Sequence, residues 1–188
     1  MNDQAVLEFI HAFGMAATAL AYLLGVVFFL IAAMKLRTVG QPASGGRAST
    51  PSGVVYTLLA SVLLVYLGAT INVMHDTAFV SDGSFNARGV DQPTAWTSKV
   101  TSTHDAMAIK GKILYDLFRL IGLIGIIKGI LTLRVLEHAR AGDGTVAKLV
   151  GYIGGGLAMY YIDKTVFAVA ELVPVVGKLN DVFMAGTI

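Results

Sequence analysis

The chain has 188 residues, of which 55% are hydrophobic and only 14% charged, and it carries a formal net charge of +2 and no cysteine. Because a soluble domain usually has about one quarter of its residues charged, this composition disfavours a water-soluble fold. The small net charge forms no basic stripe, which argues against direct nucleic-acid binding, and the lack of cysteine excludes disulfide bonds. We therefore expect an all-α integral membrane protein.

The first apolar stretch, residues 12–34, contains no charged side chain and exceeds the roughly 20 residues that a spanning helix needs. A cleaved signal peptide would begin with positive charge, whereas this chain begins with Asn2, Asp3 and Gln4, followed by Glu8. We expect the first helix to be retained as a transmembrane span.

Three later stretches are expected to span the membrane as well. Residues 53–74 are uncharged, whereas residues 113–136 and 149–170 are apolar but interrupted by ionisable groups, which favours positions that face protein. With the first stretch they predict one four-helix membrane domain over residues 1–188. Residues 75–112 would form a polar outer loop, with a short helix leading into the third span near Asp105.

The final segment, residues 174–188, is too short to span. Its apolar residues follow helical spacing, which predicts a short amphipathic helix. This helix would lie at the outer membrane surface or form a docking surface for a neighbouring subunit.

Basic residues in short loops mark the cytoplasmic side of a membrane protein. The loop at residues 35–52 has Lys35, Arg37 and Arg47 and no acid, and the loop at residues 134–148 has three bases against two acids. Both loops are therefore expected in the cytoplasm, which places both termini and the 75–112 loop on the opposite side.

The third span carries a weak echo of the first. Residues 25–37 and residues 122–134 share Gly, Leu and Arg at equivalent positions. Two tandem helical hairpins would explain this echo, and so would a generic apolar pattern.

Small residues recur at four-residue spacing on three of the expected spans. This spacing lets helix backbones approach closely, either within one bundle or between subunits. The residues are Ala17, Ala21 and Gly25 on the first span, Gly125 and Gly129 on the third, and Gly151 and Gly155 on the fourth.

Ionisable groups inside a membrane are normally paired, directed to the interface or functional. At 1.5 Å per residue, Arg119 and Asp163 would each lie about 10 Å below the outer boundary, where they could pair across two helices. Asp116 and Lys164 would join them in an outer cluster. Lys128 has no acid at its level and would reach a lipid phosphate near the inner boundary; a proton or ion relay is the competing interpretation.

The sequence gives no indication of catalytic or metal chemistry. The dipeptides His75-Asp76 and His104-Asp105 are expected to be solvated or interfacial, because adjacent residues rarely bind one metal together. The run from Gly154 to Gly156 lies inside an apolar span, so it is not a phosphate-binding loop. We expect no enzyme, no metal and no cofactor.

Two segments resemble a known family. Residues 21–29, continuing into Lys35-Leu36-Arg37, resemble the first span of the small membrane proteins called IcmC or DotE in Dot/Icm type IVB secretion systems. Residues 121–129 and 149–156 resemble their third and fourth spans. Related proteins of the TraQ type occur in IncI-like conjugation systems. The resemblance implies a non-enzymatic structural subunit in a bacterial inner membrane, with itself and other secretion subunits as partners.

The helix, basic loop and helix arrangement is also similar to conjugative pilins, which pack in a filament, or pilus, with phospholipid between subunits. By this analogy Lys35, Arg37, Lys128 and Arg134 would bind lipid phosphates, and the filament would carry the protein outside the cell. The alternative is a small ion or solute channel or transporter, in which the intramembrane charges would face one continuous polar path.

Overall fold

The computed structural model describes residues 3–39, 51–78, 106–136 and 144–172. These ranges contain six helices and no strand, which confirms the all-α expectation: α1 (Asp3–Thr38), α2 (Pro51–Val65), α3 (Leu67–Ala78), α4 (Ala106–Val135), α5 (Thr145–Tyr160) and α6 (Ile162–Leu172). The amphipathic helix expected at residues 174–188 and the dipeptide His104-Asp105 lie outside the described residues. The expected outer loop is helical at both ends, since α3 continues to Ala78 and α4 begins at Ala106.

α1 contacts the rest of the molecule along one narrow seam. Its buried residues recur at intervals of three and four positions from Leu7 to Ala32, and several, such as Gly14, Ala21 and Gly25, are small. Such a seam suits close packing of nearly aligned helices. Among the described residues, α1 is the one helix that alone is long and apolar enough to cross a membrane, as expected for residues 12–34.

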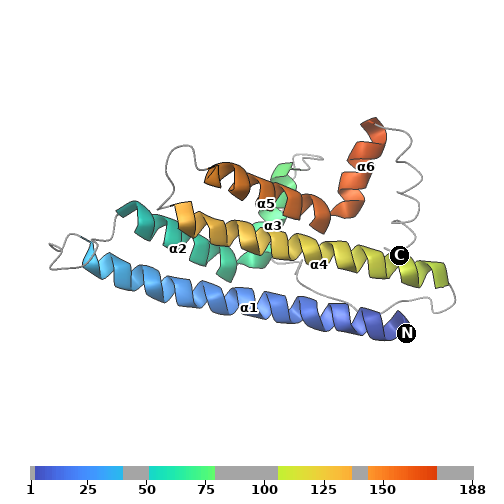
Figure 1. Ribbon diagram of the computed structural model, residues 1–188, viewed down its shortest axis with the longest axis horizontal. Coiled ribbons are helices and arrows are strands. Elements are labelled where there is room, and N and C mark those ends of the chain that lie inside the picture. Colours follow the sequence, from blue (N-terminus) through green and yellow to red (C-terminus); the bar gives the residue numbers. More distant parts are fainter. Residues whose placement is uncertain (1–2, 40–50, 79–105, 137–143, 173–188) are drawn as a thin grey trace.

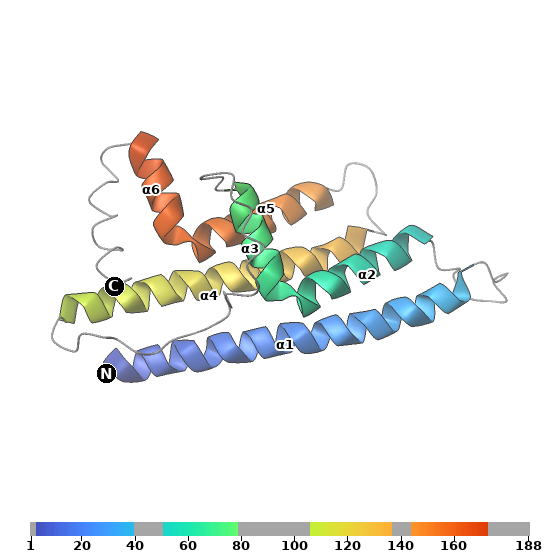
Figure 2. The same cartoon turned by 180° about the vertical axis from the view of Figure 1, so that it is seen from behind.

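The helices form two hairpins of the same design. α2 returns along α1, and α5 returns along α4 (Figure 1). α1 and α4 lie side by side and run in the same direction in both views (Figure 2). Each hairpin ends in a further short helix, α3 in the first and α6 in the second. This arrangement is the one that the sequence echo suggested as tandem hairpins.

The second and fourth expected spans are each broken. Residues 53–74 divide at Tyr66, where α3 turns by 94° from α2, and residues 149–170 divide at Tyr161. Neither break contains proline. α2 and α3 meet the length and hydropathy requirement of a span only when taken together.

The two breaks are closed by the same hydrogen bonds. Thr70 donates its hydroxyl to the carbonyl of Leu63, seven residues earlier, at 3.2 Å. Thr165 lies at the equivalent position in the second hairpin, and its hydroxyl is 2.9 Å from the carbonyl of Ala158, again seven residues earlier. The same hydroxyl also lies 3.0 Å from the carbonyl of Tyr161, four residues earlier. A break removes amide donors from such carbonyls, and a threonine hydroxyl can replace them. The repeated bond explains how both breaks form without proline.

Replacing Thr70 and Thr165 by valine should weaken both breaks. Each change removes one donor and leaves a carbonyl unsatisfied, so we expect a loss of about 1 kcal/mol per site in the free energy of unfolding. Thermal unfolding of the purified protein in detergent measures this. Thr132→Val is the matched control, because Thr132 makes an ordinary bond within α4 to the carbonyl of Lys128. Equal losses at all three positions would contradict this role.

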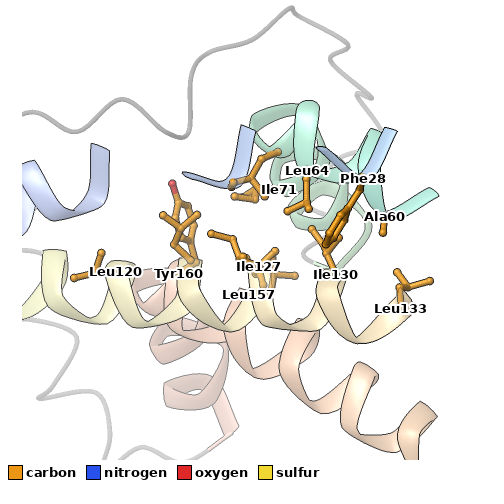
Figure 3. Packing of buried hydrophobic residues seen from close by; sticks show 14 of the residues in the cluster. Phe28, Ala60, Leu64, Ile71, Leu120, Ile127, Ile130, Leu133, Leu157 and Tyr160 are labelled. Carbon is orange, nitrogen blue, oxygen red and sulfur yellow. The ribbon is translucent and has the colours of Figure 1, made fainter. Parts of the chain in front are cut away.

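The apolar core lies where α4 meets the first hairpin and α5. Leu123, Ile126 and Ile130 of α4 are fully buried, as are Leu64 and Ile71 of the first hairpin. Figure 3 shows Ile127, Ile130 and Leu157 gathered beside Leu64 and Ile71. α4 is therefore the central helix, because it packs against both the first hairpin and α5 and its side chains form much of the core between them.

Candidate functional site

The interface between α4 and α5 is built on glycine. A Cβ atom at Gly122 would lie 2.4 Å from the amide nitrogen of Tyr160 and 2.6 Å from the carbonyl oxygen of Gly156, both backbone atoms. One at Gly156 would lie 2.8 Å from the amide nitrogen of Ile126. Gly125 and Gly129 face the same partner helix. The backbones of α4 and α5 therefore touch directly, as small residues allow in membrane bundles.

The first hairpin uses one equivalent contact. A Cβ atom at Gly25 would lie 2.8 Å from Cγ2 and 2.9 Å from the amide nitrogen of Val65, the last residue of α2. Ala21 is fully buried and Ala17 is half-buried. The structure thus places all three expected packing residues of α1 at or beside its seam.

Gly151 and Gly155 do not pack within the described part of the chain. Both are exposed, and a Cβ atom at either would meet nothing within 4 Å. α5 instead packs through Tyr152, Ile153 and Gly156, which lie on another face of the helix. Of the packing residues expected from sequence, these two are left available to lipid or to another molecule.

Gly122 and Gly156 make the closest approaches to backbone atoms, and the four-residue pattern missed both. Gly122 precedes Gly125 by three positions and Gly129 by seven, so the three share one helix face. A search that allowed three- and seven-residue spacing would have found Gly122. Gly156 follows two other glycines, and sequence alone does not distinguish which of the three meets α4.

Three basic residues of α4 each lie on an aromatic ring. The Arg119 guanidinium is 5.0 Å from the ring centre of Tyr160, and Lys128 Nζ is 4.6 Å from that of Tyr152. Arg134 reaches into the first hairpin, with its guanidinium 4.9 Å from the ring centre of Phe28. Such cation–π contacts stabilise a base where carboxylates are scarce.

The expected phosphate-binding bases occupy one half of the molecule. Lys35 and Arg37 lie in the last turn of α1, and Arg134 lies in the last turn of α4, at the same end of the bundle (Figure 1). Lys128 comes six residues before Arg134 in α4, and its side chain is exposed. Arg37 is exposed, whereas Lys35 and Arg134 are half-buried.

The expected outer charges gather with tyrosines. Arg119 donates from Nη2 to the hydroxyl of Tyr160 at 2.9 Å. Asp116 is buried at 9% exposure, and Lys112, Arg119 and His11 act on its carboxylate. We call this group the Arg119 cluster, which comprises Tyr115, Asp116, Arg119, Tyr160 and Asp163.

The structure does not bring Arg119 and Asp163 into an ion pair. The Oδ1 atom of Asp163 is buried and has no hydrogen-bond partner among the described residues, and Tyr115 is the side chain on which its charge acts. Lys164 is exposed. The two expected acids therefore lie in different surroundings: the charges of three bases act on Asp116, whereas the buried oxygen of Asp163 has no hydrogen-bond partner within the described ranges.

His75 and Tyr161 join the two hairpins near this cluster. Their ring centres are 4.3 Å apart, and His75 Nδ1 lies 3.1 Å from a carboxylate oxygen of Asp76. His75 was expected to be solvated or interfacial, and it is half-buried against Tyr161. The repeated His-Asp dipeptide marked His75 as a candidate in the sequence, but nothing in the sequence indicated that Tyr161 would be its neighbour.

Comparisons with protein-family models, curated proteins and solved structures find no match to this chain. The described residues contain no group of three or more His, Cys, Asp or Glu side chains that could hold a metal ion. The fold and the site therefore define an all-helical protein with one clear candidate span, a glycine-packed core and a tyrosine-rich charged cluster.

Proposed function

We propose that this chain crosses a bacterial inner membrane four times, with both termini on the periplasmic side. The main support is the outward surface of α1, which exposes large apolar side chains along most of its length, among them Phe13, Leu20, Leu23, Val26, Phe29, Leu30 and Met34. Soluble proteins rarely expose apolar patches of this extent. Lipid would cover this surface.

The broken helices fit this proposal as broken spans. α2 and α5 contain 15 and 16 residues, so their lengths are about 22 and 24 Å at 1.5 Å per residue. The hydrocarbon core is about 30 Å thick. Because α3 turns by 94° from α2, both helices would tilt from the membrane normal so that together they span the core, and α6 would extend α5 in the second crossing. The threonine bonds would protect the carbonyls at the breaks.

We further propose that the chain is a non-enzymatic structural subunit of a type IVB-like secretion or conjugation apparatus. The observation that carries this is the way its bases are held: Arg119, Lys128 and Arg134 each contact a different ring. Separate contacts of this kind favour a packed subunit over a channel. The type of apparatus rests on the resemblance of residues 17–40 and 119–170 to IcmC, DotE and TraQ proteins.

A pilin-like subunit that polymerises with phospholipid is the more specific form of this proposal. The exposed Gly151 and Gly155 would let a second copy approach α5 closely. Arg37, which is exposed at the end of α1, and Lys128 would contact lipid phosphates. Purified assemblies without bound phospholipid would contradict this form.

A channel or transporter is the second candidate. Repeated units with broken helices are common in secondary transporters, whose substrate sites lie where the helices break. The matched breaks at Tyr66 and Tyr161 favour this candidate. A solute flux that depends on the purified protein in liposomes would establish it over the structural role.

Membrane topology can be tested with single cysteines, because the chain has no native cysteine. A membrane-impermeant maleimide should label Ala78→Cys in intact spheroplasts and Thr38→Cys only after lysis. Val26→Cys should resist labelling until the protein is unfolded, although Val26 is 53% exposed in the isolated chain, because lipid would cover it. Rapid labelling of Val26→Cys in the native protein would contradict a membrane-spanning α1.

The structural role is tested in cells that carry the intact transfer system, with an epitope tag inserted between residues 43 and 52. Deletion of the gene should abolish transfer, and the tagged protein should restore it. Tagged protein in sheared filaments would support the pilin-like form, and retention with other apparatus subunits in the inner membrane would support a core-complex subunit. Normal transfer in the deletion strain would overturn the proposal.

A further inference from the structure

The carboxylate of Asp163 lies at a sensitive point of the second hairpin. Asp163 is in the first turn of α6, two residues after the break at Tyr161. Its Oδ1 atom is buried and has no hydrogen-bond partner among the described residues. A buried carboxylate oxygen without a donor is costly, so such an atom points to a missing partner.

The first hairpin shows that the break itself does not need this carboxylate. Aligning Thr70 with Thr165 places Gly68 at the position of Asp163. The same backbone bonds also surround both breaks: the amide of Tyr66 bonds to Val62, and the amide of Tyr161 bonds to Leu157. Since glycine suffices in one copy, the acid in the other has no role in forming the break.

The surroundings of Asp163 favour a positively charged partner. Asp163 lies between the carbonyl end of α5 and the amino end of α6, whose opposite dipole ends act on it together, so the carboxylate itself is the main negative charge at the break. Arg119 is directed at the Tyr160 hydroxyl, and Lys164 is exposed. In secondary transporters, the unwound carbonyls and the C-terminal ends of broken helices coordinate small cations. The titratable groups on the packed elements are Tyr115, Asp116, Arg119, Tyr160, Tyr161, Lys164, His75 and Asp76.

We propose that Asp163 binds Na⁺ at the break between α5 and α6, where its Oδ1 atom is buried without a hydrogen-bond partner among the described residues. The carboxylate would be the charged ligand, and the last carbonyls of α5 would complete the site. The inference goes beyond the structural role proposed above and does not depend on the secretion apparatus, because it rests on the buried oxygen and on the comparison between the two hairpins.

Carbodiimide labelling tests this site in the full-length protein in nanodiscs. Dicyclohexylcarbodiimide enters apolar regions and reacts with protonated carboxyl groups, so mass spectrometry of peptides should find it on Asp163. Because bound Na⁺ would occupy the carboxylate, Na⁺ should slow this labelling relative to choline at the same ionic strength and fixed pH.

Two comparisons keep the test decisive. Asp163→Gly copies the residue of the first hairpin, so it should keep the helical circular dichroism spectrum and lose the label. Glu8 is exposed and should react with a water-soluble carbodiimide instead. Absence of label on Asp163, or equal labelling in Na⁺ and in choline, would overturn the proposal.

Discussion

Gly122→Ala should unfold the second hairpin at a markedly lower temperature than the wild-type chain. The new Cβ would lie 2.4 Å from the amide nitrogen of Tyr160 and 2.6 Å from the carbonyl oxygen of Gly156. Because both atoms belong to the backbone, α5 would have to move away from α4 along the whole interface. Overpacking of this kind costs about 1–3 kcal/mol, so Tm should fall by roughly 5–10 °C in detergent.

Gly155→Ala is the matched control for this prediction. A Cβ at Gly155 meets nothing within 4 Å, and alanine is favoured over glycine in a helix by about 0.5–1 kcal/mol. Its Tm should be unchanged or slightly higher. If Gly155→Ala were the more damaging change, α5 would pack on α4 through a different face, and the interface described above would be wrong.

Tyr160→Phe should produce the second large loss of stability. The ring remains, so the cation–π contact with Arg119 is kept, but the hydroxyl that accepts the 2.9 Å bond from Nη2 is removed. Hydrogen bonds to charged groups contribute about 1.5–3 kcal/mol. We expect a loss in this range from urea or thermal unfolding, because Tyr160 is only 2% exposed and water cannot replace the hydroxyl.

Tyr152→Phe provides the comparison for Tyr160→Phe. Tyr152 offers its ring to Lys128 at 4.6 Å, and phenylalanine keeps that ring. The change should alter stability by less than about 0.5 kcal/mol. A double-mutant cycle of Tyr160→Phe with Arg119→Met should then give a coupling of at least about 1 kcal/mol. Additive losses would mean that the hydroxyl acts on something other than Arg119.

The sequence predicted the helical class and the seam of α1 well, because both depend on local periodicity. Residues 12–34 are apolar and uncharged, and the structure has one continuous helix there. The breaks at Tyr66 and Tyr161 were not predicted. No proline marks them, and the hydroxyls of Thr70 and Thr165 each reach a carbonyl seven residues earlier, a spacing that helical periodicity does not suggest.

The charged cluster was only partly predictable. Counting residues along each helix predicted that Arg119 lies at the level of the end of α5, where the structure has it beside Tyr160. Such a count does not determine which face of a helix a residue occupies. The tyrosine at position 160 therefore receives the Arg119 bond that was expected for Asp163. The same uncertainty of face placed Gly155 instead of Gly156 at the interface.

The parallel course of α1 and α4 bears on how such a chain could have evolved. In the proposed topology each hairpin crosses the membrane twice, so a duplicated copy begins on the same side as the original and inherits its orientation without any reversal of loop charge. Arg119 and Asp163 stand where the first hairpin has Tyr22 and Gly68, so these two charges have no counterpart in the first hairpin.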